Sequence, residues 1–177
     1  NRGAAGFRLD VADELPDKVI AMIRTRIKQI SKDSFLIGEV WEDATTKESY
    51  GQKRKYALGD GLDSVMNYPF RNACVNYLLG KLTAIGFRQL LLTQQVCYPK
   101  EMYYALMNLL SSHDIPRIRT VLSLGGDCTE LDRRQQAEVM STPQQNQKGA
   151  ALQRLAVAIC YAIPGMPSVY YGDEFGM

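Results

Sequence analysis

The sequence contains a single histidine, a single tryptophan and four cysteines among its 177 residues. The cysteines are far apart and form no C-x-x-C pair: Cys74, Cys97, Cys128 and Cys160. A zinc site needs clustered cysteine or histidine ligands, so this composition argues against a metal site of that kind. We expect free, mostly buried thiols, which are typical of a protein in a reducing compartment.

The sequence also lacks a strong charge bias and long apolar runs. Its 21 basic and 19 acidic residues give a formal net charge of +2, and the lysines and arginines are scattered along the chain. No basic patch for nucleic acid is therefore predicted. The longest apolar segments, 90–92 and 155–163, are too short or too interrupted to cross a bilayer, so no membrane partner is expected.

What the sequence does contain is an alternation of strand-like and helix-like segments. Five short apolar runs have the character of buried parallel strands: 6–11, 35–40, 62–68, 106–110 and 168–171. Helical spacing is found between them, over 13–30 with Asp13 as the expected N-cap, 71–85, 87–96 and 150–162. Polar loops are expected at 45–61 and at 123–147, the second with a turn or two of helix. This alternation predicts an α/β fold of parallel βαβ units.

Polar residues follow several of these strands, as they do at the catalytic rim of a TIM barrel. A closed (β/α)8 barrel needs eight strands, whereas this chain supplies about five. We therefore expect residues 1–177 to be the C-terminal portion of a partial TIM barrel, with flanking helices.

Arg8 and Asp10 lie two residues apart on the first predicted strand and so share one face. A guanidinium beside a carboxylate keeps the carboxylate ionised, which is the state that a nucleophile at a sugar's anomeric carbon needs. Taken alone, the pair is better interpreted as an ordinary buried ion pair.

Glu39 ends the second predicted strand, after the apolar residues 35–38. An apolar environment favours the neutral carboxyl, as a proton donor to a leaving oxygen requires. Trp41 shares this face and is a candidate platform for a sugar ring. A strand-end acid that accepts backbone hydrogen bonds is an equally good reading of Glu39 alone.

His113 and Asp114 follow the fourth predicted strand. The carboxylate could accept hydrogen bonds from sugar hydroxyls, and the imidazole could donate one, although a capping role is the simpler reading of this pair alone. Three acids at the ends of parallel strands would face one pocket. Two carboxylates across a glycosidic bond are the minimal machinery of glycoside hydrolysis, and a third can stabilise the oxocarbenium charge. Spacing by itself does not exclude another barrel enzyme.

At these positions the sequence resembles the α-amylase superfamily, glycoside hydrolase family 13. The resemblance rests on four motifs in the family's order: Gly6–Asp10 for the nucleophile strand, Gly38–Trp41 for the acid/base strand, Ser112–Asp114 for the third carboxylate, and Tyr170–Met177 for the segment that closes the eighth strand. Asp63–Phe70 and Ser112–Arg117 are most similar to neopullulanases and cyclomaltodextrinases. The resemblance covers the family's fourth to eighth barrel strands.

The resemblance implies a retaining mechanism. Asp10 would form the covalent glycosyl-enzyme, and Glu39 would protonate the leaving oxygen and then activate water. Asp114, helped by His113, would hold sugar hydroxyls, and Arg8 would orient Asp10. The implied substrates are α-1,4-linked glucans, some with α-1,6 links, or cyclodextrins, and no organic cofactor is implied.

The departures from the family pattern are also informative. Barrel strands one to three, the inserted domain that often supplies calcium ligands, and the C-terminal β-domain have no counterpart here. Asp13–Glu14 stands where neopullulanase-like sequences commonly have Asn-Glu. The resemblance and the unpaired cysteines favour the cytoplasm, although the compartment stays open.

Three alternatives remain at this level. A transglycosylase or branching enzyme uses the same scaffold, a non-catalytic relative can act as a binding subunit, and a half-barrel can be complete in itself. We expect an inactive piece of a hydrolase that associates with itself, because the strands at 6–11 and 169–171 would be left with open edges.

Overall fold

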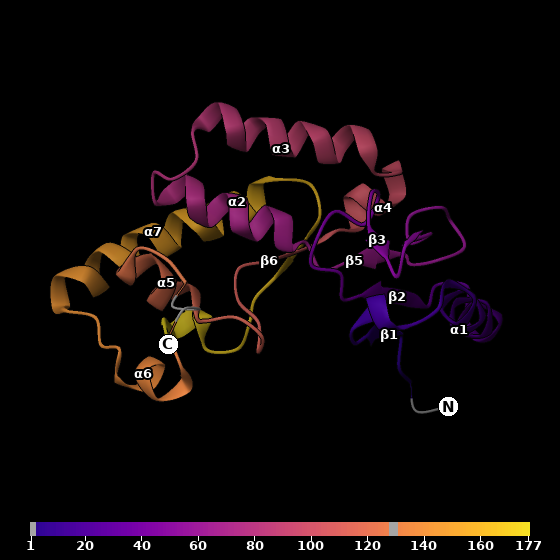
Figure 1. The fold of residues 1–177 in the computed structure, drawn as a ribbon, viewed down its shortest axis with the longest axis horizontal. Helices are drawn as coiled ribbons and strands as arrows, with labels where there is room; N and C mark the ends of the chain where they lie inside the picture. Colours follow the sequence, from indigo (N-terminus) through magenta and orange to yellow (C-terminus); the bar gives the residue numbers. More distant parts are fainter. Residues whose placement is uncertain (1–2, 128–130) are drawn as a thin grey trace. The chain divides into compact units, whose positions relative to one another are not determined.

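The computed structural model describes residues 3–127 and 131–177, so Cys128 lies outside the described residues. The chain divides into two compact units (Figure 1). Unit 1 comprises Asn1–Pro69, Leu91–Asn108 and Pro164–Met166. Unit 2 comprises Phe70–Leu90, Leu109–Ile163 and Pro167–Met177. The expected mixture of parallel strands and helices is confirmed.

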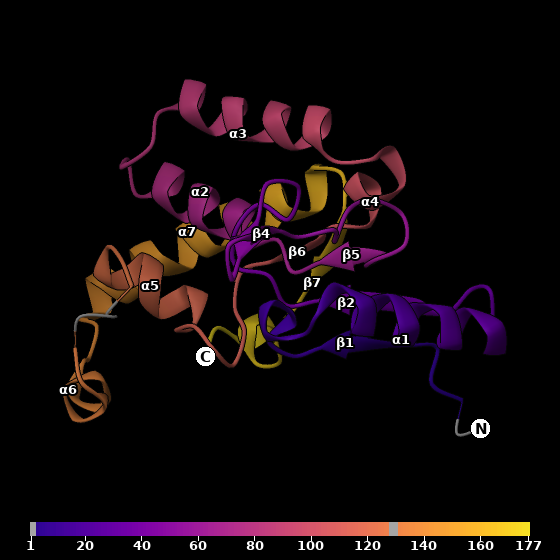
Figure 2. The same ribbon diagram turned by 45° about the vertical axis from the view of Figure 1, so that its right-hand side comes forward.

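Unit 1 is built on a parallel sheet in the order β1-β2-β5. Its strands are β1 (Gly6–Leu9), β2 (Phe35–Gly38) and β5 (Ser64–Val65). β1 and β2 pair from Gly6↔Phe35 to Leu9↔Gly38. Helix α1 (Asp17–Ile30) lies beside β1 and β2 in Figure 2. Its buried Ile20 and Ile27 join Leu36 of β2 in one apolar cluster, which is why this helix packs on the sheet.

The start of α1 differs from expectation. Asp13 is not its N-cap: Ala12–Glu14 form a separate 3₁₀ turn, η1, and Pro16 occupies the N-cap position without a side-chain cap. The physical reason is that the Asp13 carboxylate is already bound, by the Tyr56 hydroxyl at 2.6 Å and by Lys47 Nζ at 3.0 Å.

The predicted loop after β2 contains one short hairpin. β3 (Glu48–Ser49) and β4 (Gln52–Lys53) pair in antiparallel fashion. The two residues between them, Tyr50 and Gly51, have φ of 53° and 71°. Positive φ at both central positions is what a two-residue type I′ hairpin turn requires. The rest of the segment is loop, as expected.

The third predicted strand is shorter than expected because a helix begins inside it. β5 covers only Ser64–Val65, and α2 (Tyr68–Leu78) includes Pro69 in its first turn, where a missing amide hydrogen costs nothing. The next helices are α3 (Ala84–Cys97) and α4 (Lys100–Ala105). α4 was not expected from the sequence.

The last two strands are β6 (Met107–Leu109) and β7 (Met166–Ser168), which pair with each other. β7 was expected at 168–171 and forms two residues earlier. The Met166 amide donates to the Leu106 carbonyl at 2.8 Å, and Asn108 Nδ2 donates to the Pro164 carbonyl at 3.0 Å. Because of these contacts, β7 begins to pair with β6 directly after the Pro164–Gly165 turn.

Unit 2 is mostly helical. After α2 come α5 (Ile118–Leu124), α6 (Arg133–Glu138), α7 (Pro143–Ala162) and the 3₁₀ turn η2 (Asp173–Phe175), and α5 packs along α7. The segment 123–147 is expected to be a loop with a turn or two of helix; α6 agrees with this, whereas the start of α7 makes the segment more helical than expected. Both helices begin with a capping box, Asp132 with Gln135 and Thr142 with Gln145. These pairs are the sequence signal that should have located both helices.

Among the described cysteines, Cys74 and Cys160 are buried and Cys97 is exposed, and all three are free thiols. Burial is thus as expected for two of them and wrong for Cys97. In residues 3–127 and 131–177, no helix is both long enough and apolar enough to cross a bilayer. The same residues contain no group of three His, Cys, Asp or Glu side chains placed to hold a metal ion.

Candidate active site

The ends of β1 and β2 place two carboxylates at the same edge of the sheet. Because β1 and β2 are parallel and Leu9 pairs with Gly38, the following residues, Asp10 and Glu39, leave the sheet side by side. The pairing continues past the strand ends, since the Glu39 amide donates to the Leu9 carbonyl at 3.0 Å. The Ala12 amide in turn donates to the Glu39 carbonyl at 3.2 Å.

Arg8 connects the two carboxylates. Its Nη1 lies 2.6 Å from Asp10 Oδ1, and its Nη2 lies 3.1 Å from Glu39 Oε2. Burial by itself would lower the pKa of Arg8, but the hydrogen bond to Asp10 and the negative charges of Glu39 and Asp10 raise the pKa above its ordinary value. The guanidinium therefore stays charged. The sequence predicted its contact with Asp10 but not its contact with Glu39.

The two carboxylates differ sharply in exposure. The Asp10 side chain is 72% exposed, whereas that of Glu39 is 7% exposed. Besides Arg8, Glu39 has two further donors: the Val11 amide at 2.7 Å from Oε2 and Trp41 Nε1 at 3.3 Å from Oε1. An accessible carboxylate can reach a substrate carbon, while an enclosed one is held in a fixed orientation.

Val11 adopts an uncommon backbone conformation to make this contact. Its φ of 43° and ψ of 58° lie in the left-handed region, which a β-branched residue rarely enters. Such strain persists only where the surrounding structure holds it, and it is concentrated at functional sites. Here it directs the Val11 amide at the Glu39 carboxyl.

Trp41 is partly exposed, at 42%, and stacks on the buried Tyr68. The ring centroids are 4.0 Å apart, and the planes differ by 6°. Tyr68 covers one face of the indole, so only the other face is open for the sugar-stacking role predicted from the sequence. Tyr68 was missed because it was expected to end a strand, whereas it begins α2.

His113 and Asp114 lie in unit 2, after β6. His113 Nε2 is 3.4 Å from Asp114 Oδ2, and the Asp114 amide donates to the Ser112 hydroxyl oxygen at 3.1 Å. Both residues line a cavity of about 520 Å³, together with Gln136 and Val139. The structure thus brings Arg8, Asp10, Glu39 and Trp41 together in unit 1, and His113 and Asp114 together in unit 2.

Arg117 joins the segment after Asp114 to the motif near residue 170. Its guanidinium carbon lies 4.5 Å from the Tyr170 ring centroid and 4.6 Å from that of Tyr171. Its Nη1 also lies 3.4 Å from Asp173 Oδ1 and donates to the Tyr171 carbonyl. Two of the motifs recognised in the sequence are therefore in contact within unit 2.

Comparisons with known proteins show which family the chain resembles. The family model described as the alpha amylase catalytic domain matches residues 1–177. An amylopullulanase from Thermoanaerobacter thermohydrosulfuricus is 35% identical over 189 residues, which cover 99% of this chain and 12% of the relative. Neopullulanase 2 from Thermoactinomyces vulgaris is 33% identical over 177 residues, with 99% and 25% covered.

A solved structure of a cyclomaltodextrinase is similar in fold, with a TM-score of 0.70 and 31% identity. The match covers 98% of this chain and 24% of that protein. The chain therefore spans about a quarter or less of the length of the relatives that it matches.

Proposed function

Because the chain belongs to the α-amylase family of glycoside hydrolases, we propose that it forms part of a retaining α-glycosidase in which Asp10 is the nucleophile and Glu39 the general acid/base. The observation that carries this proposal is the pair of adjacent strand-end carboxylates bound to one guanidinium. Family membership alone does not require an active enzyme, whereas a retained and coupled carboxylate pair argues against a purely binding subunit.

The proposed reaction has two displacements at the anomeric carbon. In the first, Asp10 forms a bond to that carbon while the glycosidic bond breaks and Glu39 gives its proton to the leaving oxygen. In the second, Glu39 takes a proton from water, the water oxygen attacks the same carbon, and Asp10 is released. Both steps use only carboxylates and water, so no organic cofactor is invoked.

Contact with one guanidinium favours the close spacing of a retaining pair, about 5–5.5 Å between carboxyl groups, over the wider spacing of an inverting pair. Arg8 also gives a physical reason for the change in role of Glu39. In the glycosyl-enzyme Asp10 is an uncharged ester, so the positive charge of Arg8 is left to Glu39. The guanidinium then faces Glu39 alone in the step in which that residue takes a proton from water.

We propose α-1,4-linked glucans or cyclodextrins as substrates, with α-1,6 links as a further option. The support comes from the relatives, which are named for pullulan and cyclomaltodextrin. Within this proposal Asp114 and His113 bind sugar hydroxyls from the cavity that they line, and the open face of Trp41 stacks on a sugar ring.

We further propose that the chain is the C-terminal portion of a catalytic barrel whose other strands come from additional sequence. The support is that this chain covers a quarter or less of its relatives, and that the described strands do not close a barrel. On this proposal residues 1–177 alone do not turn over substrate, because half of the cleft is missing.

A trapping experiment tests the nucleophile. The protein that contains the complete barrel is treated with 5-fluoro-α-glucosyl fluoride, which reacts readily and leaves a slowly hydrolysed glycosyl-enzyme. We expect mass spectrometry to find the label on Asp10, and Asp10→Asn to remove it while substrate binding persists. As a matched control, Asp43→Asn changes a nearby acid that faces Thr45 instead, and it should label normally. A label on another residue would contradict the assignment.

A further inference from the structure

The loop that follows Glu39 is fastened to the turn that follows Asp10 by one arginine. Arg54, directly after β4, has a side chain only 7% exposed. Its Nη1 donates to the Asp13 carbonyl at 2.7 Å, and its Nη2 donates to the Leu15 carbonyl and approaches that of Ala12 at 3.5 Å. One guanidinium thus contacts the backbone carbonyls of two residues of η1 and of the residue after it.

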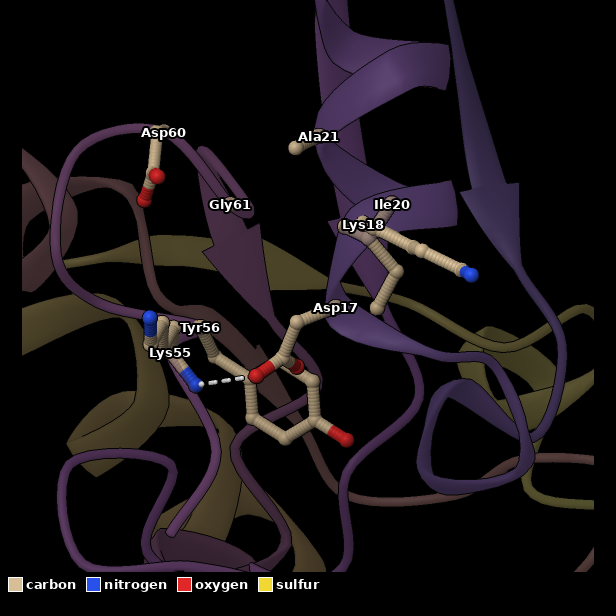
Figure 3. Close-up of a pocket in the computed structure, with 8 residues that line it drawn as sticks. All are labelled: Asp17, Lys18, Ile20, Ala21, Lys55, Tyr56, Asp60 and Gly61. Atoms are coloured by element: carbon tan, nitrogen blue, oxygen red, sulfur yellow. Dashed lines mark hydrogen bonds between the residues drawn. The ribbon is translucent and has the colours of Figure 1, made fainter. Parts of the chain in front are cut away.

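The remaining nitrogen of Arg54 binds the start of α1. Nε lies 2.9 Å from Asp17 Oδ1, while the other oxygen of the same carboxylate accepts the Lys55 amide at 3.3 Å. Figure 3 is a close-up of a neighbouring cavity of about 200 Å³. It shows the bond between Lys55 and Asp17, with Asp17 beside the Tyr56 ring. Arg54 also lies 4.7 Å from the centroid of that ring. The guanidinium is therefore held on several sides.

Other residues of the same loop bind the Asp13 side chain. The Tyr56 hydroxyl donates to Oδ1 at 2.6 Å, and Lys47 Nζ lies 3.0 Å from Oδ2. Burial, followed by the hydrogen bond to Asp13, raises the pKa of Tyr56, so its hydroxyl stays a donor. The turn that follows the nucleophile strand is thus bound by the loop through both its backbone and its side chain.

This turn is continuous with the backbone that orients Glu39. The Val11 amide donates to Glu39 Oε2 at 2.7 Å, and the Ala12 amide donates to the Glu39 carbonyl at 3.2 Å. Val11 reaches this position in the left-handed conformation, which needs outside support. The carbonyls bound by Arg54 begin at Ala12, the next residue.

We propose that Arg54 is a positioning residue for the acid/base: by binding the carbonyls of the 12–15 turn it fixes the Val11–Ala12 peptide, and through that peptide the Glu39 carboxyl. This inference rests on the proposed function. Arg54 does not touch the reacting atoms. A lysine at this position could meet Asp17, but its donors all radiate from one nitrogen and cannot span the positions that Nε, Nη1 and Nη2 of the rigid guanidinium reach together.

The chain offers a matched control. Arg24, in α1, also binds the far end of this loop, with Nε 3.2 Å from the Gly59 carbonyl and Nη1 3.0 Å from Asp63 Oδ1. It is another largely enclosed arginine that holds loop to helix, but these bonds, to Gly59 and Asp63, do not involve residues 11–15. Arg24→Gln therefore removes comparable packing and charge without loosening the turn.

The first experiment compares Arg54→Gln and Arg54→Lys with Arg24→Gln and Arg24→Lys in the protein that contains the complete barrel. We expect Arg54→Gln to lower kcat/KM about a hundredfold for maltooligosaccharides, because small misplacements of a catalytic group cost about this much. The loss should be about tenfold smaller for an α-glucosyl fluoride, whose leaving group needs little protonation. The Arg24 variants should affect both substrates equally. An equal loss for both substrates in Arg54→Gln would overturn the proposal.

The second experiment does not depend on activity. Hydrogen exchange is followed for the amides of residues 10–15, and we expect about tenfold faster exchange in Arg54→Gln, less in Arg54→Lys and no change in Arg24→Gln. Wild-type exchange in both Arg54 variants would overturn the proposal whatever their activity. If Arg54→Gln does not fold, Arg54→Lys decides both tests. A wild-type protein without glycosidase activity would refute the proposed function instead, while exchange still tests the anchoring of the turn.

Discussion

The rings of Trp41 and Tyr68 stack with their centroids 4.0 Å apart and their planes 6° from parallel, so the segment after β2 is joined to the start of α2 by one aromatic stack. Trp41 also donates to Glu39 through Nε1. The stack therefore fixes both the open face of the indole and one of the donors to the Glu39 carboxyl, the proposed acid/base.

Tyr68→Ala should disturb both stability and catalysis. Tyr68 is fully buried, and removal of a buried aromatic ring typically costs about 3–5 kcal/mol. We expect urea unfolding to show a loss of this size and kcat/KM to fall by at least about tenfold, because Trp41 loses its support. Tyr68→Phe keeps the ring and should lose only about 1 kcal/mol, from the buried hydroxyl. Equal losses in the two variants would show that the stack is unimportant.

Glu39→Gln should slow the reaction of substrates with poor leaving groups far more than that of substrates with good leaving groups. Without a proton donor, we expect the first step on maltooligosaccharides to slow by about 10²–10⁴-fold, whereas α-glucosyl fluoride should be spared in that step. Burst kinetics of fluoride release would measure this directly. Equal slowing with good and poor leaving groups would show that Glu39 is not the acid.

The described cysteines should react in a fixed order. Burial raises the pKa of Cys74 to about 12 and that of Cys160 to about 11, so at pH 8 both remain protonated and enclosed. The exposed Cys97 should be alkylated first, and Cys97→Ser should remove the fast phase among these three. Rapid labelling of Cys74 in the folded protein would contradict the structure.

The same burial makes stability depend on alkaline pH. The Cys74 thiol has a higher pKa folded than its ordinary value of 9.0, so the unfolded chain ionises first. Its contribution to stability is complete below about pH 9 and is lost as the pH rises toward 12. In Cys74→Ala, the midpoint of denaturant unfolding should fall less steeply than in the wild type as the pH rises from 8 to 10.5.

Residues 1–177 expressed alone should form dimers or larger assemblies. Among the described residues β1 pairs only with β2, so it forms an edge of the sheet, and its Phe7 is 54% exposed. Such edges recruit other chains. Light scattering should therefore report more than a monomer, with no turnover of maltooligosaccharide, cyclodextrin or pullulan. A stable monomer whose hydrolysis is removed by Glu39→Gln would instead revive the self-sufficient half-barrel.

The strands that carry Asp10 and Glu39 could be predicted because their physics is local. The segments 6–9 and 35–38 are short and mostly apolar, and α1 shows a helical apolar stripe. Asp10 and Glu39 directly follow the ends of those strands. α6 was not located as a helix because Ala137 is its one apolar residue, so that only its capping box marked it.

Arg54 shows why another part of the site was not predictable. Most of its partners are backbone carbonyls, which every residue has and which no residue type signals. The segment 45–61 consequently looked like a featureless polar loop. The role of Asp13 was likewise hidden, because its partners Tyr56 and Lys47 are more than thirty residues away in the sequence.

The anchoring of that loop has a consequence for anyone who recombines such enzymes. The segment 47–56 and the turn 12–17 are bound to each other and should be exchanged together, although they are separate in the sequence. A chimera whose imported loop lacks the arginine would leave the carbonyls of Asp13 and Leu15 without this donor and the carboxylate of Asp17 without its cation. Crossover points that keep the two segments from one parent should yield folded hybrids, and points that divide them should not.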